Sequence, residues 1–488
     1  MVIYVNANGG IQMLKKLDQI LRLFEGCFSR KASFHWFVVI VTGLMIRSDH
    51  LGVTSIIRDL SLNPSCYESL IHFFRSSAWS LESLGQTWLR IAKEFAPLYR
   101  EQDAVVLIGD GIKVAKEARF MPGVKKLHQE SENSSKAPYI FGHLFGAVGV
   151  LMGVPGKWFC LPLLFQLQDG VKTIFSWGEK PERQDSHVVQ MIELGFAAAK
   201  VFGKSILLLD RYFLSIPALE RLNLLNTAKG TLMQIVTRAK LSAVAYKKPE
   251  VKTGRGRPRK KGEQVKLKAL FSNCANEFQS ALVSIYGKKE TVEYLCLDLL
   301  WGLKLYQELR FVLVKFKGFP LILVSTDLTL DPTAIIRLYG YRFKIECTFR
   351  EIKQCIGGLA YQFWSKSMPK LKRYSKKGEA SPLEQITAEK AKQNIQLTVK
   401  AIEGYVMCSC IAMGLLQLIS IQFSHSVPAL LFRYLRTPSK AIVSEATVMT
   451  YLRKFIFRLF ALNPRLSITR IIKSKQLMPW FDEDLLVS

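Results

Sequence analysis

Residues 338–354, LYGYRFKIECTFREIKQ, place a carboxylate among hydrogen-bond donors at helical spacing. The pattern is Tyr339-x2-Arg342-x3-Glu346-x6-Lys353. At about 100° per residue, Tyr339, Arg342 and Lys353 project within roughly 40° of Glu346, on one helix face. Such a face suits the handling of phosphate groups, although an ordinary amphipathic helix has the same spacing. Gly340 disfavours an unbroken helix at this point, so the placement of Tyr339 depends on whether the helix continues.

Two further carboxylates follow runs that predict buried strands. The runs are AVVLIGD, which ends at Asp110, and SILLLD, which ends at Asp210. Either aspartate alone is also typical of a residue that caps a following helix. Three carboxylates gathered at one sheet edge repel one another unless cations lie between them. Mg²⁺ prefers oxygen ligands, and a pair of such ions can activate the attacking oxygen and stabilise the leaving oxygen of a phosphodiester displacement. The set of Asp110, Asp210 and Glu346 therefore predicts a metal-dependent phosphoryl-transfer site.

The overall charge points to a polyanionic partner. The chain has 488 residues with 68 Lys and Arg against 39 Asp and Glu, a formal net charge of +29. This excess favours salt-sensitive binding to nucleic acid. It is spread along the chain, whereas a membrane-surface protein would concentrate it on one amphipathic helix. With 49% hydrophobic residues the chain can bury a large core, and its length predicts two to four domains or one domain with insertions.

Cysteine usage and the N-terminal sequence favour a cytoplasmic protein. The nine cysteines are scattered and contain no CxxC pair, which excludes a zinc knuckle. The start MVIYVNANGGIQ lacks the basic-then-apolar order of a signal peptide. Two apolar runs, 37–45 and 405–423, imitate membrane spans. The first is too short, and the second contains Ser and Gln residues, so both are predicted to be buried helices.

Residues 1–100 are predicted to be helical and to form an N-terminal DNA-binding module. Helices at 53–60 and 65–75, joined by the turn SLNP, resemble a helix-turn-helix, with Ser65-x-x-Glu68 as a capping box. Any two helices joined by an Asn-Pro turn give the same pattern, so a purely structural pair is the alternative.

An α/β pattern with the order βββαβαβ follows this module. The expected strands are 104–110, 139–152, 158–167, 205–210 and 231–238, with helices at 186–202 and 217–225.

A basic segment then separates this pattern from the helix that carries Glu346. Residues 247–268 contain ten Lys or Arg and two Glu. Arg255-Gly-Arg257-Pro resembles the core of an AT-hook, in which Gly lets the backbone approach the floor of the minor groove, and Lys260 would contact phosphates. A solvated basic loop with nonspecific affinity is the alternative. Short strands are then expected at 265–271, 282–286, 292–300, 309–315 and 321–324, which predicts a β-rich insertion.

Together these motifs resemble the DDE transposases of bacterial insertion sequences, of the insertion-sequence-four type. The resemblance is carried by the complete Y-x2-R-x3-E-x6-K signature, by IGDGIK around Asp110 and by LLLDRYF around Asp210, and it covers about residues 104–356. The family commonly has a Trp shortly before the glutamate, where this chain has Phe343. The resemblance implies an RNase H-like catalytic core, βββαβαβ followed by a helix, with a β-rich insertion before Glu346.

The same resemblance implies roles for individual residues. Asp110, Asp210 and Glu346 would be catalytic and bind two Mg²⁺ ions, with Mn²⁺ able to substitute. DNA would be contacted by a set of polar and aromatic side chains: Tyr339, Arg342, Lys353, Arg255, Arg257, Lys260 and Trp301. Trp301 would be the insertion aromatic that stacks on a flipped base, although a core Trp is the alternative.

The sequence patterns and the resemblance together predict the domain organisation and the function. The ranges are 1–100 for the N-terminal module, 101–240 for the first part of the core, 241–325 for the insertion, 326–425 for the second part and 426–488 for a basic helical C-terminal region. The expected activity is cleavage and strand transfer at terminal inverted repeats in a prokaryotic, nucleoid-associated protein. The expected partners are transposon-end and target DNA and a second protomer, with no membrane. The alternatives are a structure-selective nuclease with the same core and a domesticated DNA-binding protein without catalysis.

Overall fold

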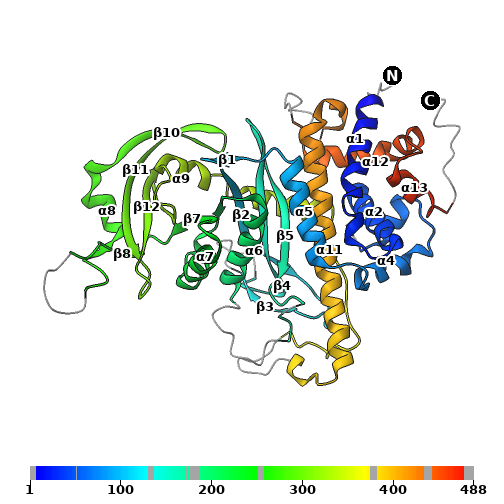
Figure 1. Cartoon of the computed structure of the whole chain (residues 1–488), viewed down its shortest axis with the longest axis horizontal. Coiled ribbons are helices and arrows are strands. Elements are labelled where there is room, and N and C mark those ends of the chain that lie inside the picture. The colour runs from blue at the N-terminus through cyan, green and yellow to red at the C-terminus, as the bar shows by residue number, and fades with distance from the viewer. Residues whose placement is uncertain are drawn as a thin grey trace.

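The computed structural model is a mixed α/β protein in which one large sheet is flanked by helices. It describes residues 7–50, 52–129, 137–171, 173–175, 186–250, 258–373, 382–432 and 442–477. Figure 1 shows an elongated molecule with a β-rich lobe at one end and a helical lobe, which contains both the first and the last helices of the chain, at the other. The central strands, which include the two expected to carry Asp110 and Asp210, lie between the two lobes.

Three long antiparallel strands and two shorter parallel ones form the centre of the sheet. They are β5 (Lys157–Leu167), β4 (Tyr139–Val154), β2 (Ala104–Ala115), β6 (Ser205–Leu208) and β7 (Met233–Ala239), in that spatial order. The helices α6 (His187–Phe202) and α7 (Ile216–Lys229) connect β5 to β6 and β6 to β7. Two short strands, β1 (Arg100–Glu101) and β3 (Lys125–His128), pair with β2 and β4. The predicted order βββαβαβ is confirmed.

The strand that carries Asp110 is longer than predicted. The sequence placed its end at Asp110, whereas β2 continues to Ala115 because residues 111–115 pair with residues 142–146 of β4. On its other side, β2 pairs with β6 only as far as Ile108 opposite Leu208. Asp110 and Asp210 therefore each lie two residues beyond the last parallel pair. Since side chains alternate along a strand, this equal offset directs both carboxylates to the same place at the end of the parallel ladder.

The β-rich lobe continues the central sheet. Strand β13 (Phe319–Ser325) pairs antiparallel with β7, and the ladder proceeds through β12 (Gln307–Phe316) and β11 (Lys288–Trp301). The remaining strands β10 (Gln279–Ile285), β8 (Val244–Tyr246) and β9 (Gln264–Lys266) complete a sheet of 13 strands. Four of the five short strands predicted for this segment, 282–286, 292–300, 309–315 and 321–324, are confirmed. The strand expected at 265–271 is wrong, because β9 ends at Lys266 and α8 (Leu267–Asn273) follows. Apolar residues at 267, 270 and 271 have helical spacing.

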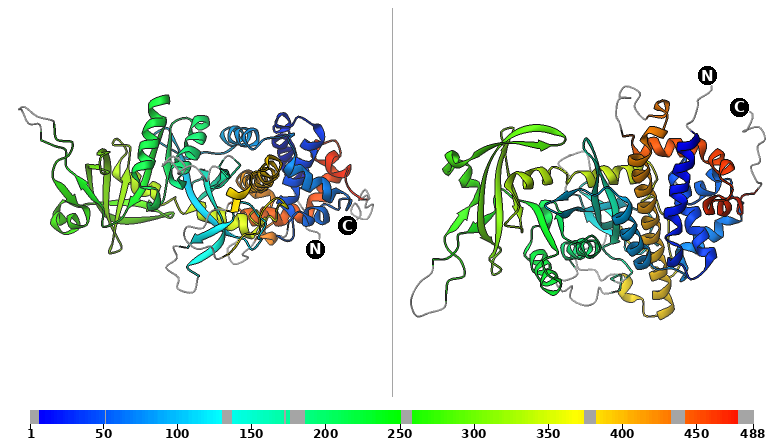
Figure 2. Two further views of the ribbon diagram at one scale, coloured as in Figure 1. Left: turned by 90° about the horizontal axis from the view of Figure 1, so that it is seen from below. Right: turned by 45° about the horizontal axis from the view of Figure 1, so that its top comes forward.

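One long helix separates the sheet from the helical lobe. The helix α11 (Glu389–Gln422) packs on β5 with one side and on α2 (Lys31–Ile46), α4 (Cys66–Arg75) and α5 (Leu81–Phe95) with others, as Figures 1 and 2 show. Among the described helices it is the one long and apolar enough to cross a bilayer, and 94% of its apolar window is buried inside the protein. The prediction that both membrane-like runs are core helices is confirmed, because α2 is buried as well.

The helical lobe is completed by α1 (Ala7–Arg22), α3 (Thr54–Asp59), α12 (Glu445–Leu462) and α13 (Ser467–Lys473). The helices α3 and α4 match the predicted pair, but the capping box is wrong. Ser65 does not cap α4, because its backbone N–H and hydroxyl both donate to Asn63 Oδ1, at 2.9 and 2.7 Å. Buried hydrophobic residues of this lobe, of α11 and of the sheet belong to one continuous core.

Two buried cations fix the chain that follows the helix α10 (Lys344–Gln354). Lys116, directly after β2, donates to the carbonyl oxygens of Leu359 and Tyr361 at 2.8 and 2.9 Å, and its Nζ lies 3.7 Å from the Tyr361 ring centroid. Arg47, which has no exposed surface, donates to the Ile356 carbonyl at 3.3 Å and to the Tyr405 hydroxyl at 2.7 Å. Because the cations come from β2 and the end of α2, they tie the C-terminal end of α10 to both the sheet and the helical lobe.

The buried lysine predicts a pH dependence of stability. Burial lowers the pKa of Lys116 to about 7, whereas lysine in an unfolded chain titrates near 10.4. Between these values the unfolded chain binds more protons, so the free energy of unfolding increases as the pH rises through this window. Lys116→Met should remove this increase, which is roughly 5 kcal/mol at most for a shift of this size.

Urea denaturation at pH 6.5, 8 and 9.5 measures this slope. The control is Lys113→Met, which removes an exposed lysine from the same strand and should retain the wild-type slope. Equal slopes for Lys116→Met and the wild-type protein would contradict the prediction.

Candidate functional site: a carboxylate cluster bridged by arginine

The signature residues span two helices rather than one. The first, α9 (Pro332–Tyr339), begins after Asp331, whose carboxylate accepts from the Thr333 and Ala334 N–H groups, and ends at Tyr339. Gly340 and the next three residues form a turn before α10, in which the Arg342 N–H donates to the Tyr339 carbonyl oxygen at 3.1 Å. The expectation of a single helix face is therefore wrong, and the break occurs where Gly340 predicts it. As a result, Arg342 lies in a connecting turn.

The fold brings the three predicted carboxylates together. Asp110 lies on β2, Asp210 follows β6 and accepts from the Arg211 N–H at 2.7 Å, and Glu346 lies in the first turn of α10, which packs on β5 and β2. The pKa of Asp110 is raised to about 6, chiefly by burial. Arg342 and the Gly111 N–H act to lower it, and the negative charges of Asp210 and Glu346 add smaller contributions to the rise. The side chain of Asp110 is 20% exposed, whereas that of Glu346 is 55% exposed. The cluster therefore has a withdrawn end at Asp110 and an accessible end at Glu346.

Arg342 joins the two ends of this cluster. Its Nη1 donates to Asp110 Oδ2 at 3.1 Å, and its Nη2 donates to Glu346 Oε1. The other oxygen of Asp110, Oδ1, accepts from the Gly111 N–H at 2.8 Å. Burial by itself would lower the pKa of Arg342, but Asp110 and Glu346 outweigh it and raise that pKa. Both oxygens of Asp110 thus have donors, and the guanidinium partly neutralises carboxylates that would otherwise repel one another.

The fit of this cluster to a metal ion is partial. Three carboxylates are the donor chemistry that Mg²⁺ prefers. Within the residues that the structure describes, however, no three Asp, Glu, His or Cys side chains are grouped closely enough to hold a metal ion. The guanidinium of Arg342 lies between Asp110 and Glu346 instead. In this arrangement the side chains have the right type but not the spacing of a metal site.

Tyr339 faces the cluster from the end of α9. Burial raises its pKa to about 12; the charge of Arg342 lowers this pKa, and Asp210 raises it. Arg238 of β7 acts on the same hydroxyl and lowers its pKa. Arg238 could not be identified from the sequence, because one Arg at the end of a strand forms no motif. Lys353 lies two turns along α10 and is exposed.

The insertion presents a different aromatic from the one predicted. Trp301 is the last residue of β11, where it is partly buried and packs against the second hydrophobic core, within the β-rich lobe. Tyr286, in the turn between β10 and β11, is 64% exposed, and its ring centroid lies 5.0 Å from that of Phe343. The two residues lie at opposite ends of β11, roughly 40 Å apart at 3.3 Å per residue. The sequence offered one signal for Tyr286, a Tyr-Gly turn between two strand-like runs.

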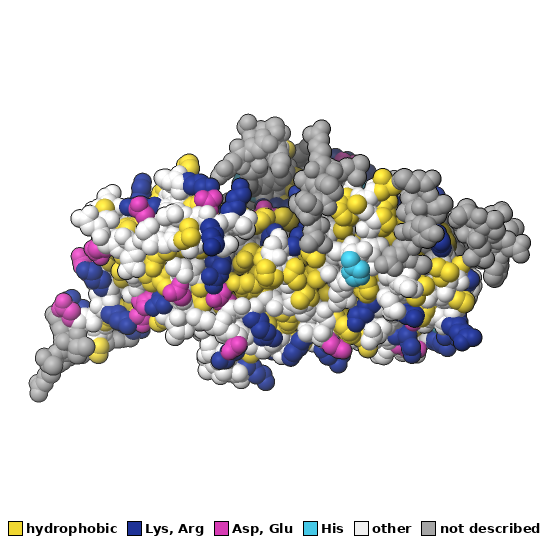
Figure 3. All heavy atoms as spheres, turned by 90° about the horizontal axis from the view of Figure 1, so that it is seen from above, with side chains coloured by type: hydrophobic (Ala, Val, Ile, Leu, Met, Phe, Trp, Pro, Cys, Tyr) yellow, Lys and Arg dark blue, Asp and Glu magenta, His cyan; other side chains and the backbone are white. Residues whose placement is uncertain are grey.

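The basic loop is described only in part. Arg255 and Arg257 lie outside the described residues, so their predicted minor-groove role stays a prediction. Lys260 is exposed in the connection between β8 and β9, and β8 lies in the β-rich lobe, away from the helical lobe (Figure 1). On the face of the molecule shown in Figure 3, Lys and Arg side chains are spread along its length and outnumber Asp and Glu. The excess positive charge is therefore not confined to this loop.

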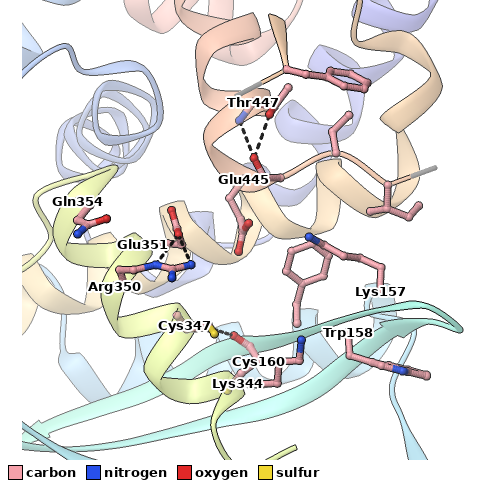
Figure 4. A pocket seen from close by; sticks show the side chains of 16 residues that line it. Lys157, Trp158, Cys160, Lys344, Cys347, Arg350, Glu351, Gln354, Glu445 and Thr447 are labelled. Atoms are coloured by element: carbon pink, nitrogen blue, oxygen red, sulfur yellow. Dashed lines mark hydrogen bonds and ion pairs between the residues drawn. The ribbon is translucent and has the colours of Figure 1, made fainter. Parts of the chain in front are cut away.

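A separate cavity of about 460 Å³ lies against another face of α10. Figure 4 shows Lys157 and Trp158 from the β4–β5 hairpin, Lys344 and Glu351 from α10, and Glu445 from the start of α12 around it. Burial raises the pKa of Glu445, and burial lowers that of Lys344. The residues that line this cavity include none of the three carboxylates of the cluster, so it is a different feature from the candidate site.

Comparisons of the chain with protein-family models, with curated proteins and with solved structures give no match. The chemistry of the carboxylate cluster must therefore be inferred from its own geometry.

Asp110 is less exposed than Glu346, which predicts that Asp110 has the larger coupling energy with Arg342. A double-mutant cycle of Asp110→Asn with Arg342→Gln should give a coupling energy of about 1–3 kcal/mol, because both side chains are largely withdrawn from water. The cycle of Arg342→Gln with Glu346→Gln should give less than about 1 kcal/mol, because Glu346 is solvated. Urea denaturation of the six proteins measures both values. A larger coupling to Glu346 than to Asp110 would contradict this geometry.

Proposed function

We propose that this chain is a DNA transposase of the DDE class, resembling the insertion-sequence-four type. The observation that carries the proposal is the equal offset of Asp110 and Asp210 from the last parallel pair, with Glu346 of α10 facing them. Asp110 and Asp210 are separated by about 100 residues, and Asp210 and Glu346 by about 136, yet all three carboxylates lie at one edge of the sheet. A structural role for each aspartate alone would not require this convergence.

The topology supports the proposed RNase H-like core. Three antiparallel strands, β5, β4 and β2, are followed by two parallel ones, β6 and β7, with α6 and α7 as the connections. The β-rich insertion enters after β7 and returns to it through β13, directly before α9 and α10. This is the arrangement that the resemblance implies, with the insertion placed before the glutamate.

Mg²⁺ is the proposed cofactor, with Mn²⁺ able to substitute, because a hard cation is what three carboxylates bind best. When bound, such ions supply Lewis-acid stabilisation of the attacking and leaving oxygens of a phosphodiester. Asp110, Asp210 and Glu346 would hold such ions, and Arg342 would then have to release its present contacts with Asp110 and Glu346. What the protein itself contributes is the position of the three carboxylates, held by the β2–β6 ladder and by the fixed end of α10.

The surroundings of the cluster suit a DNA strand. Arg342 and Lys353 can pair with phosphates, and Arg238 adds a further cation beside Tyr339. Tyr286 offers an exposed ring next to Phe343, on which a base can stack. Joining two transposon ends to target DNA requires both ends at once, so the proposed working form is a homodimer on DNA.

The carboxylates should be individually essential. Asp110→Asn, Asp210→Asn and Glu346→Gln should each lower Mg²⁺-dependent cleavage by roughly 10³-fold, since each removes a group that stabilises charge in the transition state. The assay uses DNA that flanks the gene and separates cleaved ends from strand-transfer products. Asp103→Asn is the matched control: Asp103 is exposed, lies just before β2 and has a φ of 66°, which Asn adopts readily.

The outcomes separate the candidate functions. Cleavage without strand transfer would favour a structure-selective nuclease. Wild-type activity in all three variants would exclude the carboxylate mechanism. Inverted repeats on either side of the gene would support a transposase, and their absence would favour the nuclease or a domesticated DNA-binding protein.

The exposed aromatic of the insertion gives a second prediction. Tyr286→Ala should weaken binding to a partly single-stranded DNA end by about tenfold, within the 1–3 kcal/mol of one base stack. Trp301→Phe should leave this affinity within about twofold, because Trp301 is partly buried against the core of the β-rich lobe and Phe keeps an aromatic ring there. Fluorescence anisotropy at two salt concentrations measures both. A larger loss for Trp301→Phe would restore the role that the sequence assigned to Trp301.

A further inference from the structure

The contacts of Arg342 exclude a cation from its carboxylate partners. Asp110 Oδ2 and Glu346 Oε1 accept from different nitrogens of one guanidinium, and Asp110 Oδ1 accepts from Gly111. Both oxygens of Asp110 have donors, so a cation held by Asp110 together with Glu346 would have to displace Arg342 from Asp110 Oδ2. Arg342 and a divalent cation therefore compete for the same position.

Arg342 is placed so that it can change partners. It lies in the turn between α9 and α10, so its movement does not require a helix to unwind. Its partner Glu346 is 55% exposed, which leaves one side of the pair open to an incoming anion. A phosphodiester presents two oxygens to a guanidinium in the geometry that Arg binds best.

We propose that Arg342 is an autoinhibitory residue that keeps divalent cations out of the cluster until a phosphodiester draws its guanidinium away. This inference rests on the proposed metal-dependent function. It adds that the binding of DNA and the binding of metal depend on each other. By linkage, a phosphate that withdraws Arg342 raises the affinity for the cation by the same factor as the cation raises the affinity for the phosphate.

Mn²⁺ titration, followed by the loss of the free-ion EPR signal, tests the proposal without DNA and without an activity assay. Arg342→Gln should bind Mn²⁺ about tenfold more tightly than the wild-type protein, within the usual range of coupling between sites. Dimethyl phosphate should tighten Mn²⁺ binding by the wild-type protein and have no such effect on Arg342→Gln. Glu346→Gln should weaken binding, and thermal unfolding verifies that each variant is folded.

The control for simple charge removal is Arg238→Gln. Arg238 acts on Tyr339 beside the cluster, and the variant removes one positive charge while leaving the Arg342 contacts to Asp110 and Glu346. Equal tightening in the two variants would show a general electrostatic effect and overturn the competition.

Two results distinguish a failure of the autoinhibitory role of Arg342 from a failure of the proposed metal-dependent function. Equal Mn²⁺ affinities of the wild-type protein and Arg342→Gln, both weakened by Glu346→Gln, would overturn the autoinhibition and leave the metal site intact. Mn²⁺ binding that Glu346→Gln does not alter would overturn the metal site itself, and with it the proposed function.

Discussion

Burial of the Asp110 carboxylate beside two others at one sheet edge is the constraint around which the centre of this protein is arranged. The β2–β6 ladder ends at Ile108 and Leu208, and its register delivers Asp110 and Asp210 to the same position. Adding Glu346 from α10 makes a cluster that water alone would not stabilise in a partly buried setting. The Arg342 guanidinium stabilises the cluster because its two terminal nitrogens donate to different carboxylates. These two contacts explain why the Arg342 side chain is only 16% exposed.

The helix that carries Glu346 is held at both ends. Its start follows a turn in which Arg342 contacts β2 through Asp110, and the segment after it is fixed by Lys116 and Arg47. Burying a cation is costly unless its donors are satisfied. Here Lys116 donates to two backbone carbonyls, and Arg47 donates to backbone carbonyls and a hydroxyl while its Nη2 lies 3.6 Å from Asp49 Oδ1. These contacts fix the position of the chain. The helix that carries Glu346 is therefore held in place at both ends. Arg342 lies in the turn before this helix, where its side chain can exchange partners.

The continuity of the sheet links the insertion to the same centre. Because β13 pairs with β7, the strands of the β-rich lobe extend the central ladder instead of forming a separate barrel. The turn that follows β10 consequently reaches the α9–α10 junction, where Tyr286 meets Phe343. The β-rich lobe thus contributes an exposed ring beside Phe343, directly before the helix that carries Glu346, and Trp301 is partly buried against the lobe's own core.

The sequence by itself predicted most of the central strands and helices and the residue types that meet in the candidate site. Apolar runs predicted β2 and β6, Gly340 predicted the break between α9 and α10, and the spacing of the signature identified Glu346, because these features depend on local propensity and periodicity. Local pattern could not give the extension of β2 past Asp110, the exposure of Tyr286 or the proximity of Arg238. Each of these depends on pairing between strands far apart in the chain. Above all, only the tertiary structure decided that Arg342 lies between Asp110 and Glu346, since an ion pair across 232 residues is set by packing and charge compensation, not by spacing.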